Sequence, residues 1–203
     1  MNGDVWVRES LVRIEADPAS IRRLFPMVTR KVGAGHEQVR ARLLRALPDR
    51  SELPGLYRYG DVHERRAVIA SAAVLGVDDT LLELARDAFR SNDPRLVTAS
   101  AAAAVVERLS DDEVDQVLMK CVFMGIDLSE VPALTARATA RTSKMVAGFA
   151  LERIVAGRDV APQLWGVIDR YPPDVEIAQI ERQLTADDPE RRRAAAQALA
   201  GRG

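Results

Sequence analysis

The sequence predicts an all-α protein in which short antiparallel helix pairs form a right-handed stack, an α-solenoid. Hydrophobic residues make up 47% of the 203-residue chain but aromatic residues only 4%, a balance that favours closely packed helices over a β-sandwich. Helix-start signals recur along the chain, whereas the alternating pattern of a strand does not. A single domain over residues 1–203 suits this length.

The N-terminal part predicts two helices followed by a long loop. Asp17 and Pro18 start a helix with an apolar stripe that runs to residue 32. Pro26 should kink this helix, because a proline inside a helix removes a backbone hydrogen bond. Residues 36–47 form an amphipathic helix. Residues 48–60 contain two prolines and two glycines and are expected to form the longest loop.

The middle of the chain contains the clearest helix signals. Residues 78–91 follow an aspartate cap with helical spacing of apolar residues. Asp93 and Pro94 then open an alanine-rich run, and we expect residues 96–109 to form one continuous helix at the centre of the stack. Ser110 and Glu113 have the spacing of a capping box.

The C-terminal part predicts further helices and an internal repeat. The string over 187–199 has an aspartate cap, a proline in the first turn, a basic run and then closely spaced alanines, like the inner helix of a HEAT repeat. Residues 92–95 and, more loosely, 59–67 are similar. Such units must stack on neighbours to bury their apolar faces, which predicts a HEAT-like α-solenoid. The expected helices are 129–140, 142–156, 161–171, 173–184 and 189–199.

Bulk properties exclude several classes of protein. The net charge of −1 gives no overall basic footprint for nucleic acid. The single cysteine rules out an internal disulfide or a CxxC motif, and with two histidines a zinc site is not expected. The chain has neither a signal-peptide pattern nor an apolar run of membrane-spanning length, so the expected location is the cytoplasm, without membrane insertion. No cofactor is predicted.

The residues that could carry out catalysis have simpler structural explanations. Cys121 lies on an apolar helical stripe and is expected to be a buried small hydrophobe. His36 and His63 lie near helix starts without a sequence partner, and we expect both at the surface. The paired aspartates each precede a helix, where capping accounts for them. The sequence therefore predicts no catalytic residue.

The segment 56–61 is the strongest candidate for function. It combines Tyr57 and Tyr59 with Arg58 and Asp61 on a predicted loop flanked by glycine. Tyrosine and arginine often anchor interfaces and polar ligands. The alternative is that the two tyrosines only cover the core.

Four strings stand out by their order and spacing along the chain: Leu24–Pro26, Leu56–Asp61 with Glu64–Ala67, Ser91–Val97 and Leu118–Gly125. Together they resemble the EboA family of bacterial proteins, over residues from about 25 to about 165. The resemblance implies a core region over 18–171, and residues 173–203 are then a C-terminal HEAT-like helix pair.

This resemblance implies a protein encoded in a gene cluster linked to moving a secondary metabolite precursor out of the cytoplasm. It supplies no catalytic residues, so we predict a non-enzymatic binding or scaffold protein whose partners are proteins of that cluster or a small-molecule metabolite. One alternative is an enzyme acting on an isoprenoid or polar metabolite through Cys121, His63, Asp61 or Lys120. The other is a nucleic-acid-binding helical repeat, which the near-neutral charge disfavours. The predicted ligand- or partner-binding residues are Tyr57, Arg58, Tyr59, Asp61, Arg66, Asn92, Arg95 and Lys120.

Overall fold

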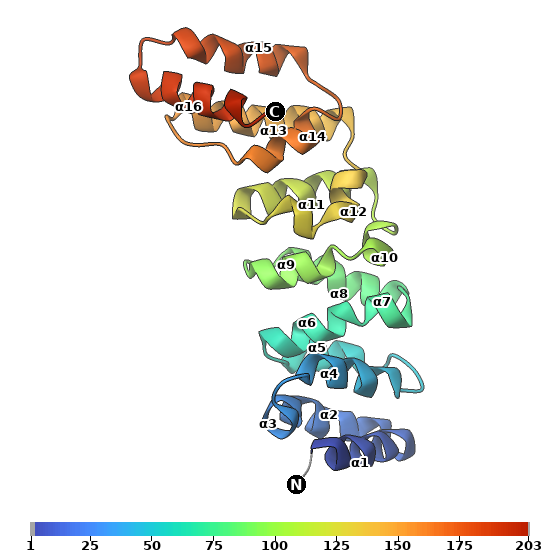
Figure 1. The fold of residues 1–203 in the computed structure, drawn as a ribbon. Helices are drawn as coiled ribbons and strands as arrows, with labels where there is room; N and C mark the ends of the chain where they lie inside the picture. Colours follow the sequence, from blue (N-terminus) through green and yellow to red (C-terminus); the bar gives the residue numbers. More distant parts are fainter. Residues whose placement is uncertain (1–2, 203) are drawn as a thin grey trace. The chain divides into compact units, whose positions relative to one another are not determined.

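The computed structural model describes residues 3–202, and every regular element within them is a helix (Figure 1). The all-α prediction is therefore confirmed for this part of the chain. Two compact units, residues 3–108 and 109–202, are described separately. A single domain over 1–203 stays a prediction.

The N-terminal unit contains ten α-helices within its described residues, several of them very short. The longest begins at the N-terminal end, where the sequence analysis predicted no helix. The elements are α1 Gly3–Ala16, η1 Pro18–Ser20, α2 Ile21–Leu24, η2 Phe25–Met27, α3 Val28–Val32, α4 His36–Arg45, α5 Leu53–Tyr59, α6 Val62–Ala70, α7 Ala72–Leu75, α8 Asp79–Phe89, α9 Pro94–Ser100 and α10 Ala103–Val106.

The helices of this unit pack in two rows. In one row α1 contacts α4, α4 contacts α6, and α6 contacts α9; α5 and α8 contact each other beside it. The α5–α6 and α8–α9 contacts connect the rows. Fully buried aliphatic side chains such as Leu43, Val68 and Val97 lie on α4, α6 and α9 and supply the core of the first row.

Local capping explains where several of these helices begin. The Asp61 side chain accepts from the backbone N–H of Glu64 at 2.9 Å, and Glu64 accepts from the N–H of Asp61, which completes a capping box. Asp78 and Asp93 cap α8 and α9 as predicted. The predicted interruption at Pro26 is also present, because the short 3₁₀ segment η2 separates α2 from α3.

The predicted loop over 48–60 is wrong in its second half, where α5 forms. Pro54 lies in the first turn of α5, where a proline is tolerated, and Gly60 follows the last residue of the helix. Leu53, Leu56 and Tyr57 are buried on its inner face. Burial of this apolar stripe outweighs the loop signal of the glycines and prolines.

The predicted continuous helix over 96–109 is also wrong, because it breaks between α9 and α10. Ala102 has an extended ψ of 144°, and Ala101 is buried while Ala103 is exposed. The break turns Val105 and Val106 of α10 into the core, where α10 contacts α7. Alanine favours helix, but burying two valines stabilises the bent path more.

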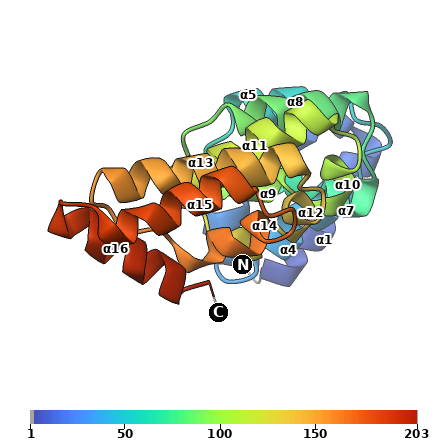
Figure 2. The same cartoon turned by 90° about the horizontal axis from the view of Figure 1, so that it is seen from above.

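The C-terminal unit is arranged around its longest helix. Its elements are α11 Asp111–Met124, η3 Leu128–Glu130, α12 Pro132–Ala136, α13 Ala140–Val155, η4 Pro162–Leu164, α14 Trp165–Ile168, α15 Asp174–Arg182, η5 Gln183–Thr185 and α16 Pro189–Ala200. Helix α13 contacts α11, α14, α15 and α16, and Figure 2 shows α13, α15 and α16 running side by side.

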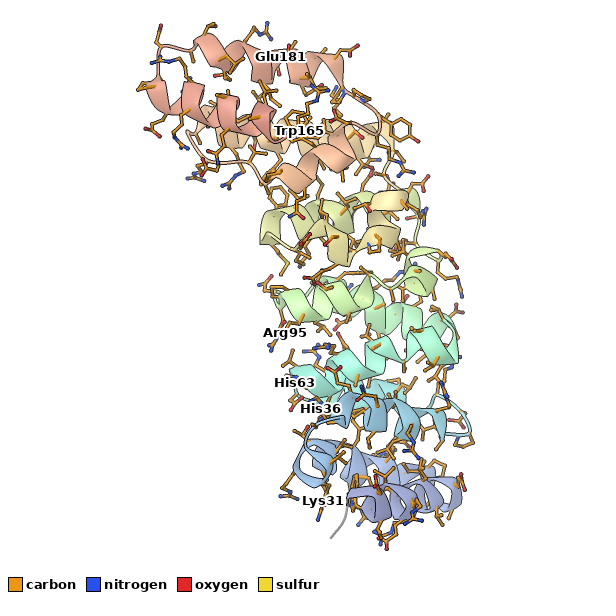
Figure 3. The ribbon with its side chains drawn as sticks, in the orientation of Figure 1. Lys31, His36, His63, Arg95, Trp165 and Glu181 are labelled. Atoms are coloured by element: carbon orange, nitrogen blue, oxygen red, sulfur yellow. The ribbon has the colours of Figure 1, made fainter. Side chains whose placement is uncertain are left out.

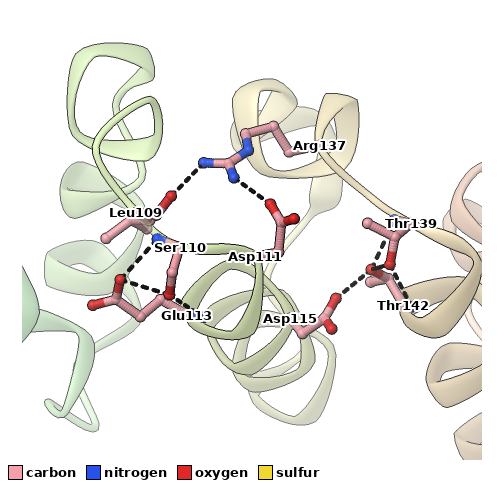
Figure 4. A network of polar contacts seen from close by, with 8 residues as sticks. All are labelled: Leu109, Ser110, Asp111, Glu113, Asp115, Arg137, Thr139 and Thr142. Atoms are coloured by element: carbon pink, nitrogen blue, oxygen red, sulfur yellow. Dashed lines mark hydrogen bonds and ion pairs between the residues drawn. The ribbon is translucent and has the colours of Figure 1, made fainter.

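A polar network connects α11 with α12 and α13 in this unit (Figure 4). Ser110 and Glu113 form the predicted capping box at the start of α11. Arg137 donates to the Leu109 carbonyl at 2.7 Å and to Asp111 at 2.5 Å. The buried Asp115 accepts from the Thr142 hydroxyl. These bonds satisfy polar groups where the helices meet.

Candidate ligand-binding cavity on helix α5

Helix α5 divides the predicted tyrosine–arginine segment between two depressions of the N-terminal unit. Tyr59 lines a cavity of about 310 Å³, together with Gly55 and Leu56. Tyr57 and Arg58 line a separate depression of about 410 Å³. The segment therefore does not form one surface, and the two depressions are lined by different residues.

The cavity beside Tyr59, here called the α5 cavity, combines apolar walls with buried carboxylates. Leu56 and Pro26 supply apolar surface, and the side chains of Glu52 and Glu64 are each only 9% exposed. Tyr59 is 84% exposed, so its ring is available to a molecule that enters the cavity. A concave site with an apolar lining and a few fixed polar groups is typical of small-molecule binding.

The Glu52 carboxylate is held by Arg22 from α2. Arg22 Nε donates to Glu52 Oε2 at 2.7 Å, and Nη2 donates to Oε1 at 2.9 Å. This two-point pair fixes the plane of the carboxylate. Hydrogen bonding to Glu52 raises the pKa of the Arg22 guanidinium above its ordinary value.

The capping box at the start of α6 fixes the Glu64 side chain, which faces the buried Arg40. Its Oε2 accepts from the Asp61 N–H at 3.1 Å, and its Oε1 lies 3.9 Å from Arg40 Nη2. Arg40 is 2% exposed, donates to Thr29 Oγ1 at 3.1 Å and lies over the Phe25 ring at 5.6 Å. The guanidinium offsets the cost of burying the Glu64 charge.

Two glycines shape the α5 cavity in opposite ways. A Cβ atom added to Gly60 would lie 2.5 Å from the Leu56 carbonyl oxygen and 2.8 Å from Glu64 Cβ, so only glycine fits there. A Cβ atom added to Gly55 would have no neighbour within 4 Å. Gly60 thus allows α5 and α6 to approach, and Gly55 leaves the cavity open.

Tyr57 lies in the second depression and is mostly buried. Its hydroxyl donates to Asp87 Oδ2 at 3.0 Å, and the Arg65 guanidinium carbon lies 4.5 Å from the centre of its ring. Burial raises the pKa of Tyr57 above its ordinary value. Its ring joins α5 to α6 and α8, while Arg58 beside it is exposed.

The structure does not bring the other predicted site residues to the α5 cavity. Asp61 caps α6, Arg66 pairs with Glu37 at 2.7 Å, and Arg95 pairs with Asp93 at 2.8 Å. Asn92 is exposed just before α9. Lys120 belongs to α11 in the C-terminal unit. None of these residues lines the α5 cavity.

Sequence reasoning missed both the α5 cavity and a pair of histidines. Arg22, Glu52 and Glu64 come from three separated segments, and no pattern in the sequence connects the three. The spacing of Asp61 and Glu64 is the one signal that could have found Glu64, as part of a capping box. His36 and His63 lie with ring centres 6.5 Å apart at the starts of α4 and α6 (Figure 3). His36 Nδ1 accepts from Arg40 at 3.3 Å, and His63 is exposed.

Cys121 is expected to resist thiol reagents in the folded protein. It is fully buried in α11, and burial raises its pKa from 9.0 to about 11, so the reactive thiolate is scarce at neutral pH. Because the unfolded thiol ionises first, stability should fall as the pH rises from about 9 to 11. Ellman's reagent should react fully only after unfolding in guanidinium chloride; rapid reaction of the native protein would contradict the burial of this thiol.

Two kinds of feature are absent from residues 3–202, a metal-binding cluster and a membrane-spanning helix. No cluster of three or more histidine, cysteine or acidic side chains in this range is arranged to hold a metal ion. No helix in the same range is long and apolar enough to cross a membrane.

Fold and site together define an all-helical protein with a small-molecule-sized cavity beside α5. The family model described as metabolite traffic protein EboA matches residues 38–169. This match covers more than half of the 203 residues, so the chain belongs to the EboA family, and the predicted resemblance is confirmed. No curated protein and no solved structure matches the chain.

Proposed function

We propose that this protein is a non-enzymatic binding protein that holds a small molecule in the α5 cavity. In this role it would act in the intracellular traffic or export of a secondary metabolite precursor, together with other proteins of its gene cluster. The family membership supports metabolite traffic, and the α5 cavity is the observation that supports direct binding. The volume of about 310 Å³ suits a small organic molecule.

A HEAT-like solenoid is the proposed architecture for this role. Within the N-terminal unit, α1, α4, α6 and α9 contact one another in sequence order, and α5 and α8 form the neighbouring row. This pattern is what stacked helix pairs produce, because each pair buries its apolar face only against the next. The rows leave α5 at the surface with a cavity beside it.

The polar groups of the cavity indicate how a ligand would be oriented. Glu52 and Glu64 each present carboxylate oxygens that can accept from a ligand hydroxyl or amine, while Leu56 and Pro26 contact its apolar part. Tyr59 can cover the bound molecule with its ring. These groups can orient a bound molecule by hydrogen bonds and apolar contact, as carriage of a metabolite requires.

Filling the cavity provides the test. In Gly55→Leu, the new side chain enters open space and occupies the volume that a ligand needs. We expect this variant to retain roughly ten-fold less of any bound metabolite, a loss of about 1.4 kcal/mol in binding. The measurement is ultrafiltration of purified protein with a small-molecule extract of cells that express the gene cluster, followed by mass spectrometry of the retained molecules.

Gly148→Leu is the matched control. Gly148 lies inside α13, and a Cβ atom there also has no neighbour within 4 Å, so the change adds the same side chain away from the α5 cavity. This variant should retain the metabolite as the wild type does. Equal retention by both variants, or no retained molecule in the wild type, would refute binding at the α5 cavity.

A further inference from the structure

A second concave site lies entirely within the C-terminal unit, at the C-terminal ends of α11 and α13. It is a groove of about 540 Å³, and we name it the phenylalanine groove after Phe123 and Phe149. Its apolar lining continues into the segment that leads to α14. The apolar residues that line it include Phe123, Met124, Phe149, Val160, Pro162 and Leu164.

Phe123 is the most exposed of the four phenylalanines. Its side chain is 66% exposed, whereas Phe25 and Phe89 are buried and Phe149 is half-buried. Its ring meets Phe149 edge to face, with the centres 5.1 Å apart and an angle of 89° between the planes. This geometry fixes both rings while leaving apolar surface in contact with water. Exposed apolar surface in a concave site favours occupation by an apolar group.

The charges beside the groove favour an anionic group on that ligand. Arg153 lines the groove, and its guanidinium carbon lies 5.9 Å from the centre of the Phe149 ring. Its Nε donates to the Asp159 backbone carbonyl at 2.7 Å, but within residues 3–202 it forms no ion pair with a carboxylate. An arginine without a carboxylate partner, set against apolar walls, is a strong anchor for an anion.

The nearby acidic side chains are already paired. Asp159 is the one acidic residue among the described residues that line the groove, and it binds Arg193 at 2.7 Å. Arg193 also pairs with Glu190, whose side chain is 66% exposed and does not line the groove. Gln197 uses its Oε1 to accept from Arg193, which leaves its amide N–H groups as further donors. The groove therefore presents hydrogen-bond donors and the Arg153 guanidinium, which forms no ion pair within residues 3–202.

We propose that the phenylalanine groove binds a small amphiphile with an apolar chain or ring and a carboxylate. The apolar part would lie against Phe123, Met124 and Pro162, and the carboxylate would pair with Arg153. This site is separate from the α5 cavity, lies in the other unit, and does not depend on the function proposed there.

Calorimetric titration with octanoate and with octanol tests the proposal, because the two probes share an apolar chain and differ in charge. Octanoate should bind saturably and more tightly than octanol. Arg153→Met should weaken octanoate binding roughly ten-fold and leave octanol binding unchanged. Phe123→Ala should weaken both, because it removes apolar contact without disturbing the core.

Arg158→Met is the matched control, because Arg158 is exposed just after the end of α13, carries the same charge and does not line the groove. It should bind octanoate as the wild type does. The Gly55→Leu variant should also bind octanoate as the wild type does, whether or not the α5 cavity binds a metabolite. Equal loss in the Arg153 and Arg158 variants would overturn the proposal, as would equal affinity for the two probes. Absence of octanoate binding would also overturn the proposal. This holds whether or not analytical ultracentrifugation shows self-association that depends on Phe123.

Discussion

Replacement of Trp165 by alanine should lower the free energy of unfolding of the C-terminal unit by about 4 kcal/mol, the cost of truncating a buried tryptophan. Trp165 is 3% exposed at the start of α14 (Figure 3), and its Nε1 donates to the Ala198 carbonyl at 2.7 Å. The Arg202 guanidinium carbon lies 4.9 Å from its ring. The substitution would therefore remove the contact that attaches α16 to α14.

Urea denaturation followed by far-ultraviolet circular dichroism measures this loss, since the tryptophan signal itself is removed. Trp165→Phe is the control: it keeps most of the apolar volume and loses the hydrogen bond, so it should cost only about 1–2 kcal/mol. If Trp165→Ala were as stable as the wild type, the packing of α14 against α16 would be wrong.

Replacement of Gly60 by alanine should destabilise the N-terminal unit by about 3 kcal/mol, although it adds a single methyl group. The new Cβ atom would lie 2.5 Å from the Leu56 carbonyl and 2.8 Å from Glu64 Cβ, both on elements that cannot move freely. The clash would separate α5 from α6 and weaken the capping box at Asp61. We expect a lower denaturation midpoint and a loss of any ligand bound beside Tyr59.

Gly55→Ala is the matched control in the same helix. A Cβ atom at Gly55 meets open space, and alanine is a better helix residue than glycine, so stability should rise by about 0.4–1 kcal/mol. Opposite signs for the two glycines would show that the Tyr-Gly-Asp string needs glycine for close packing. Equal, small effects of the two substitutions on the free energy of unfolding would contradict a clash at Gly60.

The candidate site shows where sequence reasoning reaches its limit. The sequence singled out Tyr57 and Tyr59 correctly as neighbours on one segment, but the helical path of α5 sends them into different depressions. Had the segment been a loop, as predicted, the two rings could have shared one surface. Arg22 and Glu52 were missed because charged residues thirty positions apart carry no local sign that they will meet.

Helix starts were determined by the sequence itself. Asp78, Asp93 and Ser110 cap helices at the expected positions, because a cap depends on a side chain and backbone N–H groups only a few residues away. The all-α class and the burial of Cys121 followed from equally local patterns of apolar spacing.

Tertiary packing alone decided that α5 forms where a loop was predicted, that the helix breaks at Ala102, and how the two depressions beside α5 are shaped. In each case the local preference was overruled by burial of a few side chains: Leu53 and Leu56 for α5, and Val105 and Val106 for the break. Burying an aliphatic side chain stabilises a fold by about 1.5–3 kcal/mol, whereas helix propensities differ by less than about 1 kcal/mol for residues other than proline. Which side chains become buried depends on neighbours distant in sequence, so only the folded structure reveals it.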